Sequence, residues 1–101
     1  MAALVQVLLP AFDPSDQARR GTLDQVVGEL TDRFGGVTAY TRSPATGLWQ
    51  SEGDTVRDTV VMVEVVVERL DRAWWGEYRR LLEARFDQDQ IHARALDVEQ
   101  L

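Results

Sequence analysis

Two hydrophobic patterns alternate along this chain, one with the period of a β-strand and one with the period of an α-helix. Residues 4–9 form a short β-favouring run that Pro10 stops. Apolar residues then recur at helical spacing over residues 22–34, and Thr22 with Gln25 matches a capping box, so the helix is predicted to begin there. A pair of glycines follows and is predicted to end it, because the residue just past a helix often needs a left-handed conformation.

The middle of the chain predicts two strands joined by a long connection. Residues 37–41 are predicted to form a short strand, and the β-branched stretch 56–67 a longer one. The connection 42–55 contains one proline and two glycines, which predicts a loop, with a short extension of the hairpin around residues 48–50.

The last third of the chain predicts a second helix and a final strand. Asp71 is the expected N-cap of the helix, and residues 91–98 form the weaker last strand. The core stripe of the helix is predicted to comprise Trp74, Tyr78, Leu81, Leu82 and Phe86. Trp75 would then lie at a boundary, because two adjacent helical residues cannot both face the sheet fully.

The resulting order of strand, helix, strand, strand, helix, strand predicts one α+β domain over residues 1–101. Two split βαβ units in this order are typical of the ferredoxin-like βαββαβ sandwich, a four-stranded antiparallel sheet with both helices on one face. The expected spatial order of the strands is 4-1-3-2, with the first and third strands central.

Alternation along the third strand predicts a second apolar surface on the face that the helices leave uncovered. Val61, Val63, Val65 and Val67 should face the helices, because successive side chains point to opposite faces of a strand. The opposite face should carry Leu4, Leu8, Val60, Met62 and Val66. An apolar patch of this kind usually marks a contact surface, so we expect a homodimer that packs sheet face against sheet face. A covering segment of the same chain is the alternative, but no spare segment is long enough.

Polar residues are predicted to interrupt this apolar surface. Gln6, Glu64, His92 and Arg94 should share the uncovered face if the last strand has the expected phase. They could bind a small polar ligand or move a proton, since histidine titrates near neutral pH. The other interpretation, which we favour, is an interfacial ion pair that sets the register of the dimer. Trp49, in the predicted loop, either caps the edge of the core, which we favour, or closes over a pocket.

Composition removes several kinds of chemistry. The 101 residues include no cysteine and one histidine, and all eleven basic residues are arginine. Disulfides, thiolate metal sites, cysteine nucleophiles and Schiff-base lysines are therefore excluded, and we assign no catalytic residue, cofactor or metal. A net charge of −6 opposes the approach of nucleic acid. The sequence shows no membrane span and no secretory signal, so we expect a cytoplasmic protein.

The second helix also carries a local group of arginines. Arg69, Arg72, Arg79 and Arg80 lie on or next to it, with acidic residues interleaved among them. A solvated face held by ion pairs is the ordinary explanation.

Three short motifs resemble a family of uncharacterised short bacterial proteins. They are Phe34-Gly35-Gly36-Val37-Thr38, Gly47-Leu48-Trp49 and Arg85-Phe86-Asp87-Gln88. The resemblance covers about residues 22–95 and implies a ferredoxin-like fold in an intracellular bacterial setting, with no known activity. Tautomerases with a nucleophilic proline share the small α+β size, but Ala2 follows Met1 here.

Two functional hypotheses follow from the sequence. The first is a homodimeric binding or assembly module without identifiable chemistry. The second is a small-molecule enzyme or ligand-binding protein that resembles dimeric ferredoxin-like monooxygenases and uses the open sheet face or the cleft under residues 42–55. An enclosed pocket next to Gln6, Glu64 and His92 would favour the second hypothesis.

Overall fold

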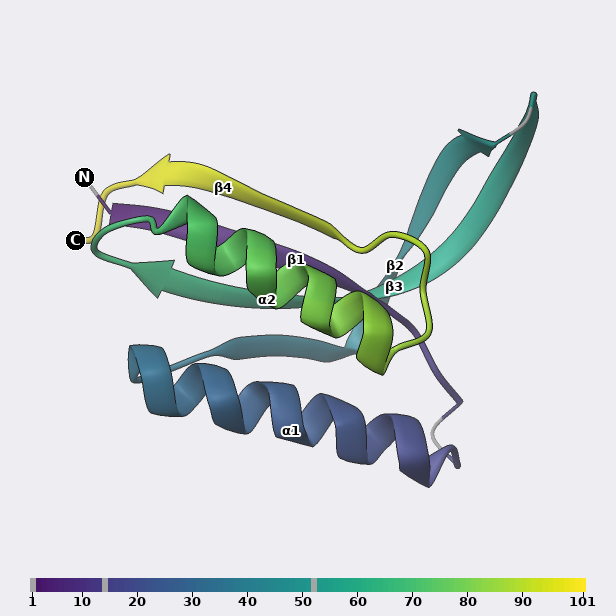
Figure 1. The fold of residues 1–101 in the computed structure, drawn as a ribbon, viewed down its shortest axis with the longest axis horizontal. Helices are drawn as coiled ribbons and strands as arrows, with labels where there is room; N and C mark the ends of the chain where they lie inside the picture. Colours follow the sequence, from purple (N-terminus) through teal and green to yellow (C-terminus); the bar gives the residue numbers. More distant parts are fainter. Residues whose placement is uncertain (1, 14, 52) are drawn as a thin grey trace.

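The chain forms six elements in the order expected from its patterns (Figure 1). The structure is a computed structural model. It describes residues 2–13, 15–51 and 53–101, without the side chains of residues 42–47, 49–51 and 54–59. The elements are β1 (Ala2–Pro10), α1 (Gln17–Phe34), β2 (Thr38–Ser51), β3 (Asp54–Val67), α2 (Arg72–Arg85) and β4 (His92–Val98).

The strands make one antiparallel sheet in the order β2-β3-β1-β4, which confirms the ferredoxin-like α+β fold and the predicted strand order. Within the sheet, Gln6 of β1 lies opposite Glu64 of β3 and Arg94 of β4. Residues directly opposite one another share a face, so this register fixes the phase of the last strand. Both helices lie on the side of the sheet opposite to the side chains of Gln6, Glu64 and Arg94 (Figure 1).

The hydrophobic core fills the space between the helices and one face of the sheet. Alternate residues of the two central strands enter it, and each of them is at most 6% exposed. They are Ala3, Val5, Val7 and Leu9 from β1 and Val61, Val63, Val65 and Val67 from β3. The predicted direction of the four valines is therefore confirmed. Leu23, Val26 and Leu30 of α1 and Leu82 of α2 close the core from the helix side.

A polar contact joins the two helices outside the core. The Arg85 guanidinium donates to both carboxylate oxygens of Glu29, at 2.6 and 2.7 Å, and the Tyr78 hydroxyl donates to Glu29 Oε1 at 2.9 Å. The hydrogen bond from Arg85 holds the pKa of Glu29 below its usual value. Burial, followed by the Glu29 contact, raises the pKa of Tyr78. The contact fixes α1 against α2 while both charges keep a partner.

The first helix begins earlier than its capping box predicts. Asp16 is the N-cap and its side chain accepts a hydrogen bond from the Arg19 amide at 3.0 Å. Thr22 lies within the helix, where its hydroxyl donates to the Ala18 carbonyl. The predicted start is wrong because the first turn of the helix is mostly polar, so it does not show the helical spacing of apolar residues from which the start was predicted. The predicted end is confirmed, since Gly35 caps the helix with φ of 85°.

The second helix presents a different tryptophan to the core than its stripe predicts. Trp75 is 7% exposed, whereas Trp74 is only partly buried and Leu81 is 44% exposed. Trp74 instead packs edge-on against Phe34 and parallel to Tyr78, with the Arg33 guanidinium 4.3 Å from its ring centre. Trp75 therefore takes the core position predicted for Trp74. Trp74 lies at the boundary predicted for Trp75, where it packs against Phe34, Tyr78 and Arg33. The predicted N-cap, Asp71, is confirmed, since its side chain accepts from the Trp74 amide.

The predicted loop 42–55 is wrong for most of its length, because it belongs to a long β2–β3 hairpin, whereas the predicted extension of the hairpin around residues 48–50 is confirmed. The register jumps from the pair Tyr40–Met62 to the pair Ala45–Val60, so residues 41–44 form a bulge that contains the proline. Proline lacks the N–H that a strand ladder needs, and a bulge accommodates it. The turn is made at Gly53, with φ of 85°. Residues 45–51 and 54–59, which we call the arm, project beyond the part of the sheet that the helices cover (Figure 1).

Candidate functional site

A hydrogen-bonded row of polar side chains crosses the uncovered sheet face from β4 to β2. Arg94 Nε donates to Gln6 Oε1 at 2.7 Å, and Gln6 Nε2 donates to Glu64 Oε2 at 2.8 Å. The Tyr40 hydroxyl donates to the other oxygen of Glu64. The structure thus brings three of the predicted site residues together and adds Tyr40. We call these four residues the polar row.

The polar row holds its carboxylate in the ionised form. The hydrogen bond from Gln6, followed by that from Tyr40, lowers the pKa of Glu64, and desolvation opposes these contributions only in part. The same contact with Glu64 raises the pKa of Tyr40. One end of the row is therefore anionic, and the other end carries the guanidinium cation of Arg94.

Apolar side chains lie on both sides of the polar row. Leu4, Val66 and Leu96 lie on one side, in register with each other, and Leu8 and Met62 lie on the other. Val66 is 41% and Leu96 48% exposed, and the other three are partly buried. We call these five residues together with the polar row the open face.

Two members of the open face were missed from the sequence, and one predicted member contributes little. Tyr40 and Leu96 were missed because neither the second nor the last strand has a strong alternation of its own. Cross-strand pairing with Met62 and Leu4 supplies the phase that the local pattern lacks. Val60 is only 8% exposed, so it adds little area to a contact surface.

A hollow of about 410 Å³ lies at the end of the open face where the arm begins. His92 and Arg94 line it together with Leu8, Leu48 and Val60. His92 is opposite Leu8 in the sheet register, so it lies on the same face as the polar row, as predicted. The side chain of Trp49, the remaining predicted site residue, lies outside the described residues.

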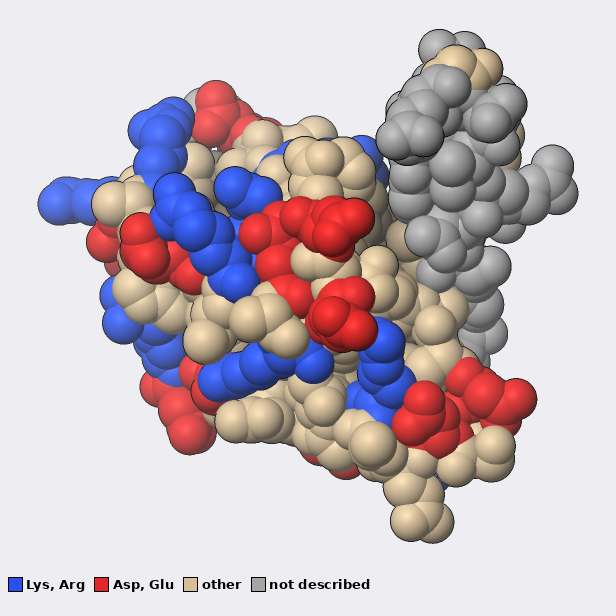
Figure 2. Space-filling view, turned by 45° about the vertical axis from the view of Figure 1, so that its right-hand side comes forward, with Lys and Arg blue, Asp and Glu red and all other residues tan. Residues whose placement is uncertain are grey.

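Neither a metal-ligand cluster nor a membrane-spanning helix is found among the described residues. No three His, Cys, Asp or Glu side chains come together there. No helix in that part of the chain has the length and apolarity needed to cross a bilayer. On the side drawn in Figure 2, acidic and basic side chains are interspersed rather than gathered into one charged patch.

The fold places this chain among small ferredoxin-like α+β proteins, and its own open sheet face carries a polar row between apolar residues. Similar solved structures include the divalent cation tolerance protein CutA1 of Thermus thermophilus. It has 16% identity and a TM-score of 0.63, with 99% of this chain and 86% of that chain covered. CutA1 of Oryza sativa has 13% identity and a TM-score of 0.64, with 98% and 81% covered.

A third similar structure, the periplasmic divalent cation tolerance protein CutA of Archaeoglobus fulgidus, has 14% identity and a TM-score of 0.62 over 99% and 86% of the two chains. At these identities the similarity shows the fold. No family profile and no curated protein matches the sequence. The ferredoxin-like fold implied by the resemblance to short bacterial proteins is confirmed. The resemblance of the three sequence motifs to that family stays a prediction. The structural neighbours belong to the named CutA group and not to an uncharacterised one.

Proposed function

We propose that this chain is a self-associating binding or assembly module of the bacterial cytoplasm, with the open face as the contact between copies and a homodimer as the assembly. The observation that carries the proposal is the exposure of Val66 and Leu96 beside the polar row. No described segment of the same chain covers this surface (Figure 1). A surface of this character is typical of a protein contact.

The polar row supports a twofold arrangement in particular. Arg94 lies at one end of the row, and Glu64 with Tyr40 lies at the other. A twofold axis that lies between the two sheet faces, runs along the strands and passes over Gln6 would reverse the row of the second copy, so each cationic end would lie over an anionic end. The row is thus complementary to itself, and complementary charges favour one register of the contact over others.

The apolar residues supply the driving force. Complete burial of a large aliphatic side chain stabilises by about 1.5–3 kcal/mol. The five apolar residues of the open face are already partly covered, so burying the rest of each side chain stabilises the dimer by about 1 kcal/mol. For two copies the gain is about 10 kcal/mol. This gain is of the same order as the association cost of about 4–15 kcal/mol.

The structural neighbours are named for divalent cation tolerance. No three His, Cys, Asp or Glu side chains come together in the described part of this chain, so we assign it no metal ligands.

Substitution of Met62 tests the proposal. Met62→Asp puts a charge among the apolar residues of the open face, where a dimer would bury it without a partner. We expect the wild-type chain to sediment as a dimer and the variant as a folded monomer. Leu81→Asp is the matched control, because Leu81 is an exposed leucine on α2, away from the open face. A monomeric wild-type chain, or equal dimerisation by Met62→Asp and wild type, would overturn the proposal.

A second candidate function is small-ligand binding or catalysis in the hollow beside His92. The specific observation that favours it is the presence of His92 and Arg94 next to apolar Leu8 in a space of about 410 Å³. Pockets for small ligands commonly start at roughly 300 Å³ and combine an apolar lining with a few polar groups. A crystal structure of the assembled protein separates the two candidates. A dry, filled contact supports the assembly module, and a persistent hollow with unexplained density beside His92 supports the ligand binder.

A further inference from the structure

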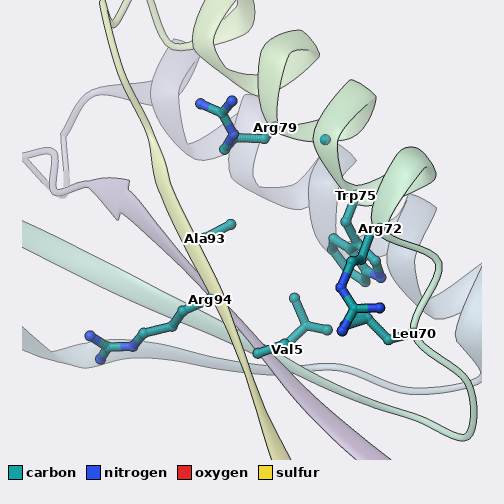
Figure 3. Close-up of a pocket in the computed structure, with 9 residues that line it drawn as sticks. Val5, Leu70, Arg72, Trp75, Arg79, Ala93 and Arg94 are labelled. Atoms are coloured by element: carbon teal, nitrogen blue, oxygen red, sulfur yellow. The ribbon is translucent and has the colours of Figure 1, made fainter.

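A second hollow, of about 370 Å³, lies on the helix side of the sheet between α2 and β4 (Figure 3). Its floor is apolar and consists of Val5 and Trp75, both part of the buried core. Its wall on β4 consists of Ala93 and Ala95, which pair with Val7 and Val5 of β1. These side chains are short, so the outer strand does not close the space beside the helix. We call this hollow the α2 groove.

A glycine keeps the helix side of the α2 groove open. Gly76 lines the groove, and a Cβ atom placed on it would meet nothing within 4 Å. Packing therefore does not require a glycine here. Glycine inside a helix is less favourable than alanine by roughly 0.5–1 kcal/mol, so the helix is less stable for it. Because Gly76 has no side chain, the groove next to the ring of Trp75 is wider than it would be with any other residue at this position.

Two arginines supply positive charge along the α2 groove. Arg72 and Arg79 are seven residues apart and therefore lie on the same side of α2. Figure 3 shows both side chains leaving the helix on the groove side, whereas Arg94 turns away toward the open face. Arg79 donates to Glu83 Oε2 at 2.9 Å.

Arg72 differs from Arg79 because no described carboxylate pairs with it. Glu68 and Asp97 line the adjoining hollow together with Arg72, yet neither forms an ion pair with it among the described residues. The expected ion-paired arginine face is confirmed for Arg79 and Arg80. Arg72 retains its donors, and a guanidinium binds a carboxylate through two parallel hydrogen bonds.

We propose that the α2 groove binds a small organic monocarboxylate with an apolar body. Val5 and Trp75 receive the apolar part, and Arg72 receives the carboxylate, with Arg79 adding to the local positive potential. Of the two arginines that leave α2 on the groove side, only Arg72 lacks a described carboxylate partner, and the chain has a net charge of −6, so the groove favours one negative charge over a polyanion. The groove lies on the opposite side of the sheet from the open face, so this proposal does not depend on self-association.

The test is a titration of the full ¹⁵N-labelled chain with hexanoate, followed by amide NMR. We expect saturable shifts centred on the amides of Gly76, Ala93 and Ala95. Hexanol, which has the same chain without the charge, should bind about tenfold more weakly, because it cannot make the charged hydrogen bonds.

Three variants and a control assign the binding to the groove. Arg72→Gln should weaken hexanoate binding by about tenfold and leave hexanol unchanged. Arg72→Lys should retain part of the affinity, because it keeps the charge but not the paired donors. Gly76→Leu should abolish the shifts by filling the groove, and Arg20→Gln, at an exposed arginine of α1, should change nothing. Equal binding of hexanoate and hexanol, no effect of Arg72→Gln in a folded variant, or shifts confined to the open face would overturn the proposal.

Discussion

At the residue scale, the behaviour of Glu64 depends on the two donors that hold its carboxylate. Gln6 and Tyr40 both donate to it, and Arg94 is linked to it only through the amide of Gln6. A dimer that covers the polar row would remove water from all four side chains at once. The charges of Arg94 and Glu64 would then be stabilised only by the hydrogen bonds within the row and by the opposite charges of the partner copy.

The substitution Glu64→Gln removes the negative charge while keeping the shape of the side chain. We expect the dimer dissociation constant to rise about tenfold, because Arg94 loses its counter-charge in the covered row. Since the pKa of Glu64 is lowered, the wild-type dimer should keep its affinity at neutral pH and lose it only as the pH falls through that lowered pKa. Sedimentation equilibrium at neutral and acidic pH measures both effects. A dimer insensitive to the substitution and to pH would show that the polar row lies outside the contact.

Glu29 provides a separate prediction about pH and stability. Arg85 lowers the pKa of Glu29 in the folded chain, so its stabilising contribution is present above the unfolded value near 4.5 and is lost as the pH falls through the folded pKa. Glu29→Gln should lower the free energy of unfolding at neutral pH by about 1 kcal/mol, since the pair is partly exposed. Urea unfolding of both proteins should give a smaller difference at acidic pH. A constant difference would mean that ionisation of Glu29 contributes nothing.

At the element scale, the sequence predicts segments whose local pattern agrees with the final packing and misses those that depend on partners. The valines of β3 and the glycine cap of α1 are both local signals, and both are confirmed. The sequence predicts a loop over most of residues 42–55 because Pro44 and Gly47 are turn formers. Pairing of Gly47 with Asp58 in the ladder overrides that preference. Trp74 and Trp75 were exchanged because helical spacing alone cannot choose between adjacent residues.

The glycines of α1 give a prediction about this element. Gly28 is exposed inside the helix, and a Cβ there would meet nothing within 4 Å. Gly28→Ala should therefore raise the free energy of unfolding by about 0.5–1 kcal/mol. Gly35→Ala is the matched comparison and should lower it by about 1 kcal/mol, because φ of 85° at the helix end is costly for any residue with a Cβ. Thermal unfolding followed by circular dichroism measures both changes. The same sign for the two variants would contradict this account of α1.

At the scale of the whole molecule, the sequence predicts the fold and most of the open face, because alternation in the two central strands specifies both surfaces of the sheet. Leu4, Leu8, Met62 and Val66 all lie on the uncovered side as predicted. Strand phase at the two edges of the sheet follows from pairing, so Tyr40 and Leu96 could be found only in the structure. The α2 groove could not be predicted from the sequence either. It results from short side chains on α2 and β4, and the sequence alone does not show that these residues lie next to each other.

The most direct test of the central claim is a measurement of which side chains from two copies contact each other. Mixing ¹³C-labelled with unlabelled chains and recording isotope-filtered nuclear Overhauser spectra reports only contacts between copies. We expect such contacts from the methyl groups of Met62, Leu8 and Val66, and none from Leu81 on α2. Contacts confined to the helix side, or their complete absence at millimolar protein concentration, would contradict the account.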